Sequence, residues 1–169
     1  MNDTTSPAYW LDTNTLIESM KRWYRFDMVP GFWSFVDEKV EEGIICSPVK
    51  VYDELVDKVD DDLAKWAKQR EGPPFFREPD QSVQNFVGNI ANHVLKKYKP
   101  TKAAKDLLDG ADVWLIAYAA VHGGTVVTLE AGAVPGKLNK VRIPLVCDDV
   151  GVDWVSLFDM CEALGMKLG

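Results

Sequence analysis

Two aspartates stand at positions where a carboxylate does little for folding and much for binding a cation. Asp12 directly follows the apolar segment 9–11, a short strand candidate, and Asp112 lies within the apolar run 110–120. A carboxylate that leaves water must be paired, hydrogen-bonded or bound to a metal ion, because an isolated buried charge is very costly. The two aspartates are therefore candidates for one cation-binding site.

Asp112 lies on an apolar side of its expected helix. At 100° per residue, Leu115, Ile116 and Ala119 all fall within about 60° of Asp112 on a helical wheel. A solvated aspartate would normally lie on the opposite side of the helix. The alternative is a buried aspartate that backbone donors satisfy.

Asp12 and Glu130 each follow an expected strand. The segment 125–129, Thr-Val-Val-Thr-Leu, is the clearest strand in the chain, and Glu130 comes directly after it. In an open parallel sheet, ligands bind beyond the carboxyl ends of the strands, so both acids are expected on that rim. Asp12 could instead be only a helix N-cap, and Glu130 could be an ordinary loop acid.

A further acid comes from the helix expected after residue 48. The apolar face of this helix centres near Val59, and Asp53 and Glu54 lie about equally far from that centre on opposite edges. Periodicity does not choose between the two acids. A solvated acidic face that also includes Asp57 is the alternative.

Three other aspartates give weaker signals. Asp109 is expected to be the N-cap of the helix that contains Asp112, although it lies on the same side and could join the site. Asp148 and Asp149 lie in a turn-like Cys-Asp-Asp-Val-Gly segment, where aspartate is common without any role in a site.

Other chemistries find little support in the sequence. His93 and His122 have no Ser or Cys partner suggested by spacing, and Gly123-Gly124 precedes a strand, so it does not form a phosphate loop. The lysines between residues 96 and 105 are either a solvated helix end or a local track for phosphates.

The composition is that of one soluble globular domain. The chain has 169 residues, 47% of them hydrophobic and 27% charged, and its formal net charge is −7. This charge argues against general electrostatic binding of nucleic acid, but it does not exclude a nuclease, since active-site carboxylates are themselves acidic. Without a signal peptide or an apolar stretch of membrane-spanning length, we expect a cytoplasmic protein with no membrane partner and three buried, reduced cysteines.

Strands are expected to alternate with helices. The expected strands span residues 9–11, 44–47, 125–129, 141–147 and 152–155. The expected helices span residues 16–25, 32–42, 48–59, 60–69, 83–98, 109–121 and 157–164. This alternation predicts an α/β fold with a parallel sheet that helices cover on both faces.

The order of these segments resembles a PIN domain over nearly the whole chain. Within that superfamily, five segments are similar to a bacterial and archaeal branch grouped as DUF4411: Tyr-Trp-Leu-Asp-Thr-Asn, Phe-Asp-Met-Val-Pro-Gly-Phe-Trp, Val-Tyr-Asp-Glu-Leu, Ala-Asp-Val-Trp-Leu-Ile-Ala and Gly-Thr-Val-Val-Thr-Leu-Glu. The resemblance implies a PIN-like three-layer sandwich, with a short central parallel sheet flanked by helices. It implies a single domain of residues 1–169, with a helical insertion around residues 60–105 that could be a lid or partner surface.

The resemblance makes Asp12, Glu54 and Asp112 the three core acids, and so favours Glu54 over Asp53. Glu130 takes the place of a fourth acid that is usually Asp in PIN domains, and the longer side chain here could act through water. Supporting hydrogen bonds are expected from Thr13, Asn14 and Thr128.

PIN domains are metal-dependent ribonucleases, widespread as toxins of VapC type. The resemblance thus implies an endoribonuclease that uses Mg²⁺ or Mn²⁺, hard cations that prefer oxygen ligands, to activate a water for attack on RNA phosphodiesters. It also implies the toxin of a VapBC-like type II toxin-antitoxin system, with RNA as substrate, a cognate antitoxin as partner and, as is common in the family, a homodimer.

Three alternatives stand beside this interpretation. One is a free-standing PIN nuclease in RNA processing or DNA repair, and another is a non-catalytic PIN-like interaction module, which the Glu at position 130 would fit. The third is a haloacid-dehalogenase-like phosphatase. It is disfavoured because the segment Asp12-Thr13-Asn14-Thr15 has Asn14 where that family's opening motif has a second Asp.

Overall fold

The structure is a computed structural model that describes residues 7–58, 61–133, 135 and 141–168 of the chain. Among these residues, we find no helix of sufficient length and apolar character to cross a membrane. The start of one expected helix, at Asp60, lies outside the described residues.

A parallel sheet lies at the centre of the described fold. Its strands are β1 (Tyr9–Leu11), β2 (Ile45–Pro48), β3 (Phe76–Arg77), β4 (Thr125–Val127) and β5 (Trp154–Val155). They lie in the order β3-β2-β1-β4-β5, and every neighbouring pair is parallel. The chain builds the sheet outward from β1 to β3 on one side and then returns to add β4 and β5 on the other. The order therefore reverses between β1 and β4, and ligands of open α/β sheets bind at such a switch point.

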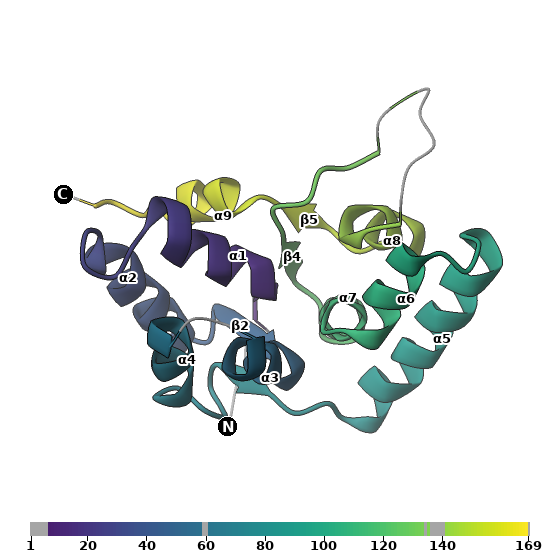
Figure 1. The fold of residues 1–169 in the computed structure, drawn as a ribbon, viewed down its shortest axis with the longest axis horizontal. Coiled ribbons are helices and arrows are strands. Elements are labelled where there is room, and N and C mark those ends of the chain that lie inside the picture. The colour runs from purple at the N-terminus through teal and green to yellow at the C-terminus, as the bar shows by residue number, and fades with distance from the viewer. Residues whose placement is uncertain (1–6, 59–60, 134, 136–140, 169) are drawn as a thin grey trace.

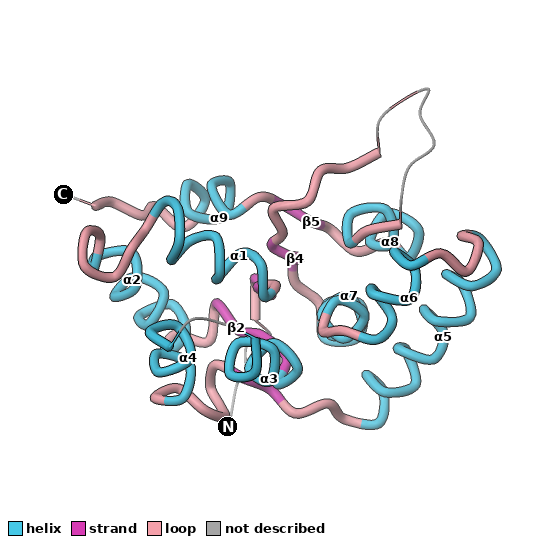
Figure 2. Tube along the Cα trace, viewed as in Figure 1, coloured by secondary structure: helices cyan, strands magenta, loops and turns pink. Residues whose placement is uncertain are grey.

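Helices cover both faces of the sheet. They are α1 (Thr13–Glu18), the π-helical turn η1 (Ser19–Trp23), α2 (Pro30–Glu41), α3 (Val49–Lys58), α4 (Asp61–Lys68), α5 (Gln81–Lys97), α6 (Lys102–Asp109), α7 (Asp112–His122), α8 (Ile143–Val150) and α9 (Leu157–Ala163). In Figure 1, α1 to α4 and α9 lie on one side of the strands, and α5 to α8 lie on the other. Figure 2 shows the same three layers, with the short strands enclosed between helices.

Successive residues of β1 point into two separate cores. Trp10 packs in a cluster with residues of α5 to α8, whereas Leu11 packs in a second cluster with residues of α1 to α4 and α9. This follows from the pleat of a strand, which sends neighbouring side chains to opposite faces. The expected α/β sandwich is thus confirmed, and the three cysteines are buried and free, as expected.

The segment 60–105, expected to be a helical insertion, includes part of the central sheet. It holds α4, β3, α5 and the start of α6, and β3 pairs with β2 through Ser47 and Pro48. Pro48, expected to open a helix, is instead the last residue of β2. That this segment acts as a lid or partner surface stays a prediction.

The strand expected over residues 141–147 is wrong, because this segment forms helix α8. Its run from Ile143 to Cys147 is fully buried, and a short buried apolar run has no period that separates strand from helix. Pro144 stands in the first helical turn, where proline is tolerated, and Gly151 closes the helix in the left-handed conformation. Asp148 and Asp149 are therefore helical residues, not part of a turn.

The helix expected over residues 109–121 is present as α7, but it begins at Asp112 and not at Asp109. Asp109 is the last residue of α6, so the expectation that it caps the following helix is wrong. Gly110 breaks the chain, Ala111 occupies the N-cap position, and α7 begins at Asp112. Both aspartates therefore lie at the start of a helix. Asp12 is the N-cap of α1, and Asp112 is the first residue of α7.

Candidate functional site

Asp12 is a buried carboxylate at the carboxyl end of the central strand. Only 1% of it is exposed, and its Oδ1 accepts a hydrogen bond of 2.6 Å from the backbone N–H of Thr15, so it caps α1. Burial raises the pKa of Asp12 to about 6. Hydrogen bonding with Thr15 and Thr128 lowers this pKa, whereas the negative charge of Glu130 raises it further. The cap and a cation ligand are compatible roles, because an ionised carboxylate has about four acceptor positions.

Glu54 connects the chain segments that carry the two aspartates. The hydroxyl of Thr13, the residue after Asp12, donates to Glu54 Oε2 at 2.7 Å. The backbone N–H of Ala111, the residue before Asp112, donates to Glu54 Oε1 at 2.9 Å. One carboxylate on α3 therefore holds the start of α1 and the start of α7 together.

Gly110 allows this close approach. A Cβ atom at this position would lie 3.1 Å from Glu54 Oε1 and 3.2 Å from the carbonyl oxygen of Asp106, which is closer than nearly all real Cβ contacts. On the same helix as Glu54, Asp53 and Asp57 are exposed, while Glu54 itself is half-buried. The structure thus brings Glu54, not Asp53, to the aspartates.

Asp112 is the half-buried first residue of α7. A carboxylate is favoured at a helix N-terminus, where the unpaired N–H groups carry partial positive charge. Most of the following helix is buried, including the stretch from Leu115 to Ala119. The apolar neighbours that we found on the helical wheel therefore reflect a helix that is buried on most sides, not one apolar face centred on Asp112.

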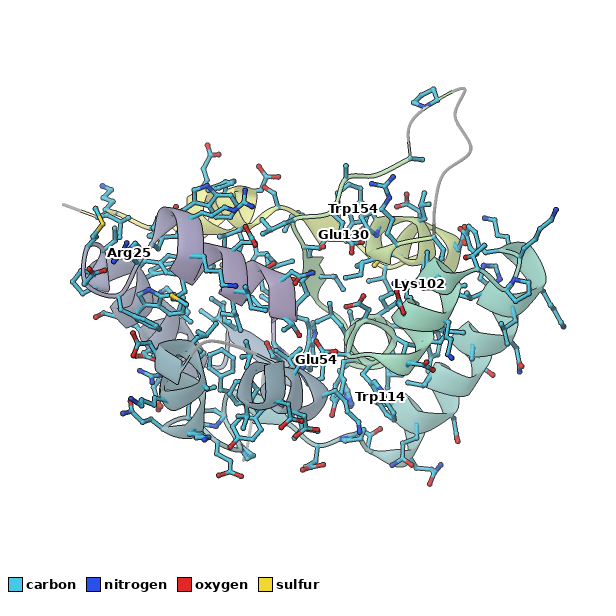
Figure 3. All side chains as sticks on the ribbon, viewed as in Figure 1. Arg25, Glu54, Lys102, Trp114, Glu130 and Trp154 are labelled. Atoms are coloured by element: carbon cyan, nitrogen blue, oxygen red, sulfur yellow. The ribbon has the colours of Figure 1, made fainter. Side chains whose placement is uncertain are left out.

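Glu130 is fixed between β4 and α8. Its Oε2 accepts the backbone N–H of Ile143, the first residue of α8, at 2.8 Å, and its own N–H donates to Thr128 Oγ1 at 3.1 Å. Thr128 is buried and also hydrogen-bonds to Asp12, so Asp12 and Glu130 share one threonine. Figure 3 shows Glu54 on α3 and Glu130 beside α8, so the two glutamates approach from different layers.

Of the expected supporting residues, Thr13 and Thr128 make the contacts described above, while Asn14 is exposed. Sequence reasoning missed the backbone donors from Ala111 and Ile143, whereas the donor from Thr15 is the N-cap contact that stood as the alternative for Asp12. The Thr15 donor has a signal in the sequence, because an N-cap aspartate accepts from the N–H two or three residues later. The other two donors come from residues far away in the sequence, and no local pattern announces them.

Asp149 lies in another cluster, on the outer helices. Its carboxylate accepts hydrogen bonds from Tyr98 Oη at 2.6 Å and from the ammonium of Lys97, and it contacts His93 Nε2 at 2.9 Å. These contacts join α5 to α8. Lys97 is thus an ion-pair partner, whereas Lys96, Lys99, Lys102 and Lys105 are exposed.

The four acids offer the donor chemistry of a hard divalent cation. All are carboxylates, and Mg²⁺ and Mn²⁺ prefer oxygen ligands. Over the described ranges, no three acidic, His or Cys side chains are gathered as a ready metal site. The oxygens of Asp12, Glu54 and Glu130 instead accept N–H or O–H groups, each of which leaves acceptor capacity on the carboxylate. The residues fit such a cation by ligand type.

Solved structures of toxin-antitoxin proteins share the fold. A chain of DNA-bound VapBC from Salmonella typhimurium superposes with a TM-score of 0.56 at 17% identity, over 89% of this chain and 98% of that chain. A chain of VapBC2 from Rickettsia felis, bound to a DNA fragment from their promoter, gives 0.53 at 11% identity, over 88% and 97%. A chain of VapBC-1 from nontypeable Haemophilus influenzae gives 0.53 at 16% identity, over 88% and 96%. At these identities the likeness shows the fold, and it confirms the PIN-like sandwich.

The sequence itself places the chain in a family. Among curated proteins, no sequence matches it. Residues 9–168, from the first strand to the end of the described chain, match the family described as Domain of unknown function (DUF4411). The chain therefore belongs to the DUF4411 family, and its fold is PIN-like.

Proposed function

We propose that the chain is a Mg²⁺- or Mn²⁺-dependent endoribonuclease, and that it acts as the toxin of a VapBC-like type II toxin-antitoxin system. The observation that carries this proposal is the Glu54 carboxylate, which accepts from Thr13 and Ala111 and so draws the segments of Asp12 and Asp112 together. The solved structures that share the fold come from VapBC assemblies, which supports the proposal at the level of the fold.

The raised pKa of Asp12 fits a cation site. Burial favours the protonated form of this carboxylate, and the nearby Glu130 adds like-charge repulsion. A divalent cation relieves both effects, since it replaces the lost hydration and offsets the negative charge. We assign Asp12, Glu54 and Asp112 as the residues that would hold it, with Glu130 as a fourth acid, bound directly or through water.

A bound hard cation would supply Lewis-acid chemistry, activating a water and stabilising the leaving oxygen of a phosphodiester. The residues of the chain itself orient the acids that would hold the cation. Thr13 and the Ala111 N–H orient Glu54, and the Ile143 N–H orients Glu130. Residues that hold metal ligands in place matter strongly for affinity and activity.

Cleavage of RNA by the purified full-length chain tests the nuclease. We expect Mg²⁺ or Mn²⁺ to support cleavage of single-stranded RNA, and we expect a chelator to abolish it. Asp12→Asn and Asp112→Asn should each abolish cleavage while the far-ultraviolet circular dichroism and the cooperative melting stay intact. Asp57→Asn is a matched control, because it makes the same change at an exposed acid of α3. Full cleavage by Asp112→Asn, purified free of contaminating nuclease, would exclude the assignment.

Expression in a bacterial host tests the toxin. Induction of the wild-type chain should arrest growth, and Asp12→Asn should restore it at equal expression. An adjacent small open reading frame whose product relieves the arrest would be the cognate antitoxin. Cleavage in vitro without growth arrest would instead favour a free-standing PIN nuclease in RNA processing or DNA repair.

A non-catalytic PIN-like module is the competing candidate. It is favoured by the backbone N–H groups that Glu54 and Glu130 accept at the starts of α7 and α8, since these bonds alone would give both acids a structural role. Isothermal titration with Mn²⁺ separates the candidates. Saturable heat that Asp12→Asn removes supports the metal enzyme, and no heat from the folded wild-type chain supports the module.

A further inference from the structure

A lysine and a tryptophan meet at the same helix junction that holds Glu54. Lys50 lies in the first turn of α3, and its ammonium stands over the ring of Trp114 on α7, 5.7 Å from the ring centroid. Lys50 is exposed, and Trp114 is half-buried against the core beneath α7. The pair is a cation on an aromatic face at the surface of the molecule.

The pair is one helical turn from the candidate site. Lys50 and Glu54 are four residues apart on α3, and Ala111 and Trp114 are three residues apart at the start of α7, so each couple shares one side of its helix. The Glu54–Ala111 hydrogen bond and the Lys50–Trp114 contact therefore both join α3 to the start of α7, one helical turn apart along α3. Figure 3 shows Glu54 and Trp114 near one another between α3 and α7.

Two partners are within reach of the Lys50 side chain, the Glu54 carboxylate and the Trp114 ring. A lysine four residues before a glutamate on a helix can form an ion pair with it. Here both oxygens of Glu54 accept other donors, from Thr13 and Ala111, and the Lys50 ammonium lies over Trp114. The exposed cation therefore stands one helical turn from Glu54, and its contact is with the ring of Trp114.

We propose that Lys50 and Trp114 form a subsite for single-stranded RNA, in which Lys50 moves off the ring to bind a phosphate and the uncovered face of Trp114 stacks on an unpaired base. This proposal rests on the nuclease function proposed above. A separation of one helical turn is comparable with one nucleotide of an extended strand, so a strand whose phosphodiester reaches the acids passes this pair. Aromatic faces bind bases of single strands, and a duplex keeps its bases stacked internally and out of reach. The subsite therefore favours unpaired RNA over duplex RNA. It also supplies a local positive charge on a protein whose net charge is −7.

Equilibrium binding of RNA to the non-cleaving Asp12→Asn protein tests the subsite. The probe is a fluorescein-labelled single-stranded oligoribonucleotide in Mg²⁺ buffer, measured by anisotropy at several salt concentrations, with the same sequence as a duplex for comparison. Added Lys50→Met should lower the slope of log K against log salt by about 0.7, the loss of one phosphate contact. Added Trp114→Leu should weaken single-strand binding by at least about fivefold and leave duplex binding unchanged.

Matched controls make the same substitutions at an exposed lysine and an exposed tryptophan elsewhere on the surface. Lys68→Met removes an exposed lysine of α4, and Trp23→Leu removes an exposed tryptophan of η1, and both should bind like the parent. Trp114→Phe keeps an aromatic face and should keep most of the affinity. Because Lys50 is exposed, Lys50→Met should fold and tests the subsite even where Trp114→Leu does not fold.

The outcomes separate the subsite from the nuclease. Cleavage by the wild-type chain, together with unchanged affinity and salt slope in the folded Lys50→Met and Trp114→Leu proteins, would overturn the subsite alone. A lower melting temperature without a change in binding would show that the pair is purely structural, and would overturn the subsite as well. Absence of both cleavage by the wild-type chain and binding by the parent would overturn the nuclease and the subsite together.

Discussion

The side chains of Thr13 and Glu54 meet across 41 positions of sequence, with the Thr13 hydroxyl donating to Glu54 Oε2 at 2.7 Å. Thr13 is buried and Glu54 is half-buried, so the bond is partly shielded from water. A hydrogen bond to a charged group is stronger than one between neutral groups. The orientation of the Glu54 carboxylate is therefore tied to the residue that follows Asp12.

Thr13→Val removes this hydroxyl while keeping the shape of the side chain. We expect the free energy of unfolding to fall by about 1 to 2 kcal/mol, because Glu54 loses a donor in a shielded place. We also expect the affinity for Mn²⁺ to fall about 10- to 100-fold, the usual effect of losing a residue that orients a metal ligand. Urea denaturation and isothermal titration measure the two effects. Thr13→Ser, which keeps a hydroxyl, should retain both, and unchanged Mn²⁺ affinity in Thr13→Val would contradict the positioning role.

Asp12→Asn should stabilise the metal-free protein at neutral pH. The pKa of Asp12 is raised from 3.8 to about 6 in the fold, so the native state holds a proton that the unfolded chain has already lost. The stabilisation from this proton is complete below pH 3.8 and is lost as the pH rises through 6, a change of about 3 kcal/mol. Asn does not titrate, and it caps helices as well as Asp does.

The difference in unfolding free energy between Asp12→Asn and the wild type should therefore grow from pH 4 to pH 7, toward about 3 kcal/mol. Urea denaturation in chelator at several pH values measures it. Added Mn²⁺ should stabilise the wild type and not the variant. A difference that is constant with pH would show that burial does not raise the pKa of this carboxyl.

Glu130→Gln and Glu130→Ala separate two roles of one side chain. Gln keeps an oxygen that accepts the Ile143 N–H, so α8 should keep its anchor and the protein its stability. Ala leaves that N–H without its acceptor and should cost about 1 kcal/mol. Thermal melting of both variants measures how much the Ile143 contact contributes to stability. Titration of Glu130→Gln with Mn²⁺ measures how much the negative charge contributes to metal affinity. Equal destabilisation by both variants would argue against the Ile143 contact as the anchor.

Asp149→Ala should destabilise the protein without affecting cleavage. Burial acts to raise the pKa of Asp149, but hydrogen bonds from Lys97, Tyr98 and His93 outweigh it and hold this pKa below its usual value. Loss of these bonds should cost about 2 to 3 kcal/mol at neutral pH. Because the folded pKa is lowered, this stabilisation is present above the ordinary pKa of Asp and disappears as the pH falls through the folded value.

Denaturation curves of the wild type and Asp149→Ala should therefore converge in acid and differ most at neutral pH. Cleavage by the folded variant, measured well below its melting temperature, should match the wild type. A loss of cleavage in the folded variant would connect the α5–α8 cluster to the site.

The places of Asp12 and Glu130 follow from the sequence, because Asp12 directly follows β1 and Glu130 comes three residues after β4, the parallel strand beside it, so both lie toward the same rim. The choice of Glu54 over Asp53 does not follow from the residues of that helix. Both lie at equal distances from its apolar face, and only the fold brings Thr13 and Ala111, 41 and 57 residues away, to one of them. The family resemblance favoured Glu54 where periodicity left both acids open, and Glu54 is the acid that contacts Thr13 and Ala111.

The errors of sequence reasoning share a physical cause. In α8 and α7, burial extends over most sides of the helix, so the contrast between an apolar and a polar face is weak. The residues of α8 were consequently expected to form a strand, and the helix that contains Asp112 was expected to begin three residues too early, at Asp109. Gly110 marks the true break before α7, but a single glycine within an apolar run is a weak signal without the close contact to Glu54.

The short first strand leaves the site no tolerance for a change in chain length. Trp10 fills one core and Leu11 fills the other, and each residue of β1 has a fixed partner on β4, from Tyr9 opposite Thr125 to Leu11 opposite Val127. Deleting one residue before Asp12 would exchange the two side chains between the cores and draw the carboxylate about 3.3 Å back into the sheet. The spacing from Tyr9 to Asp12 is therefore as much a part of the site as the acid itself.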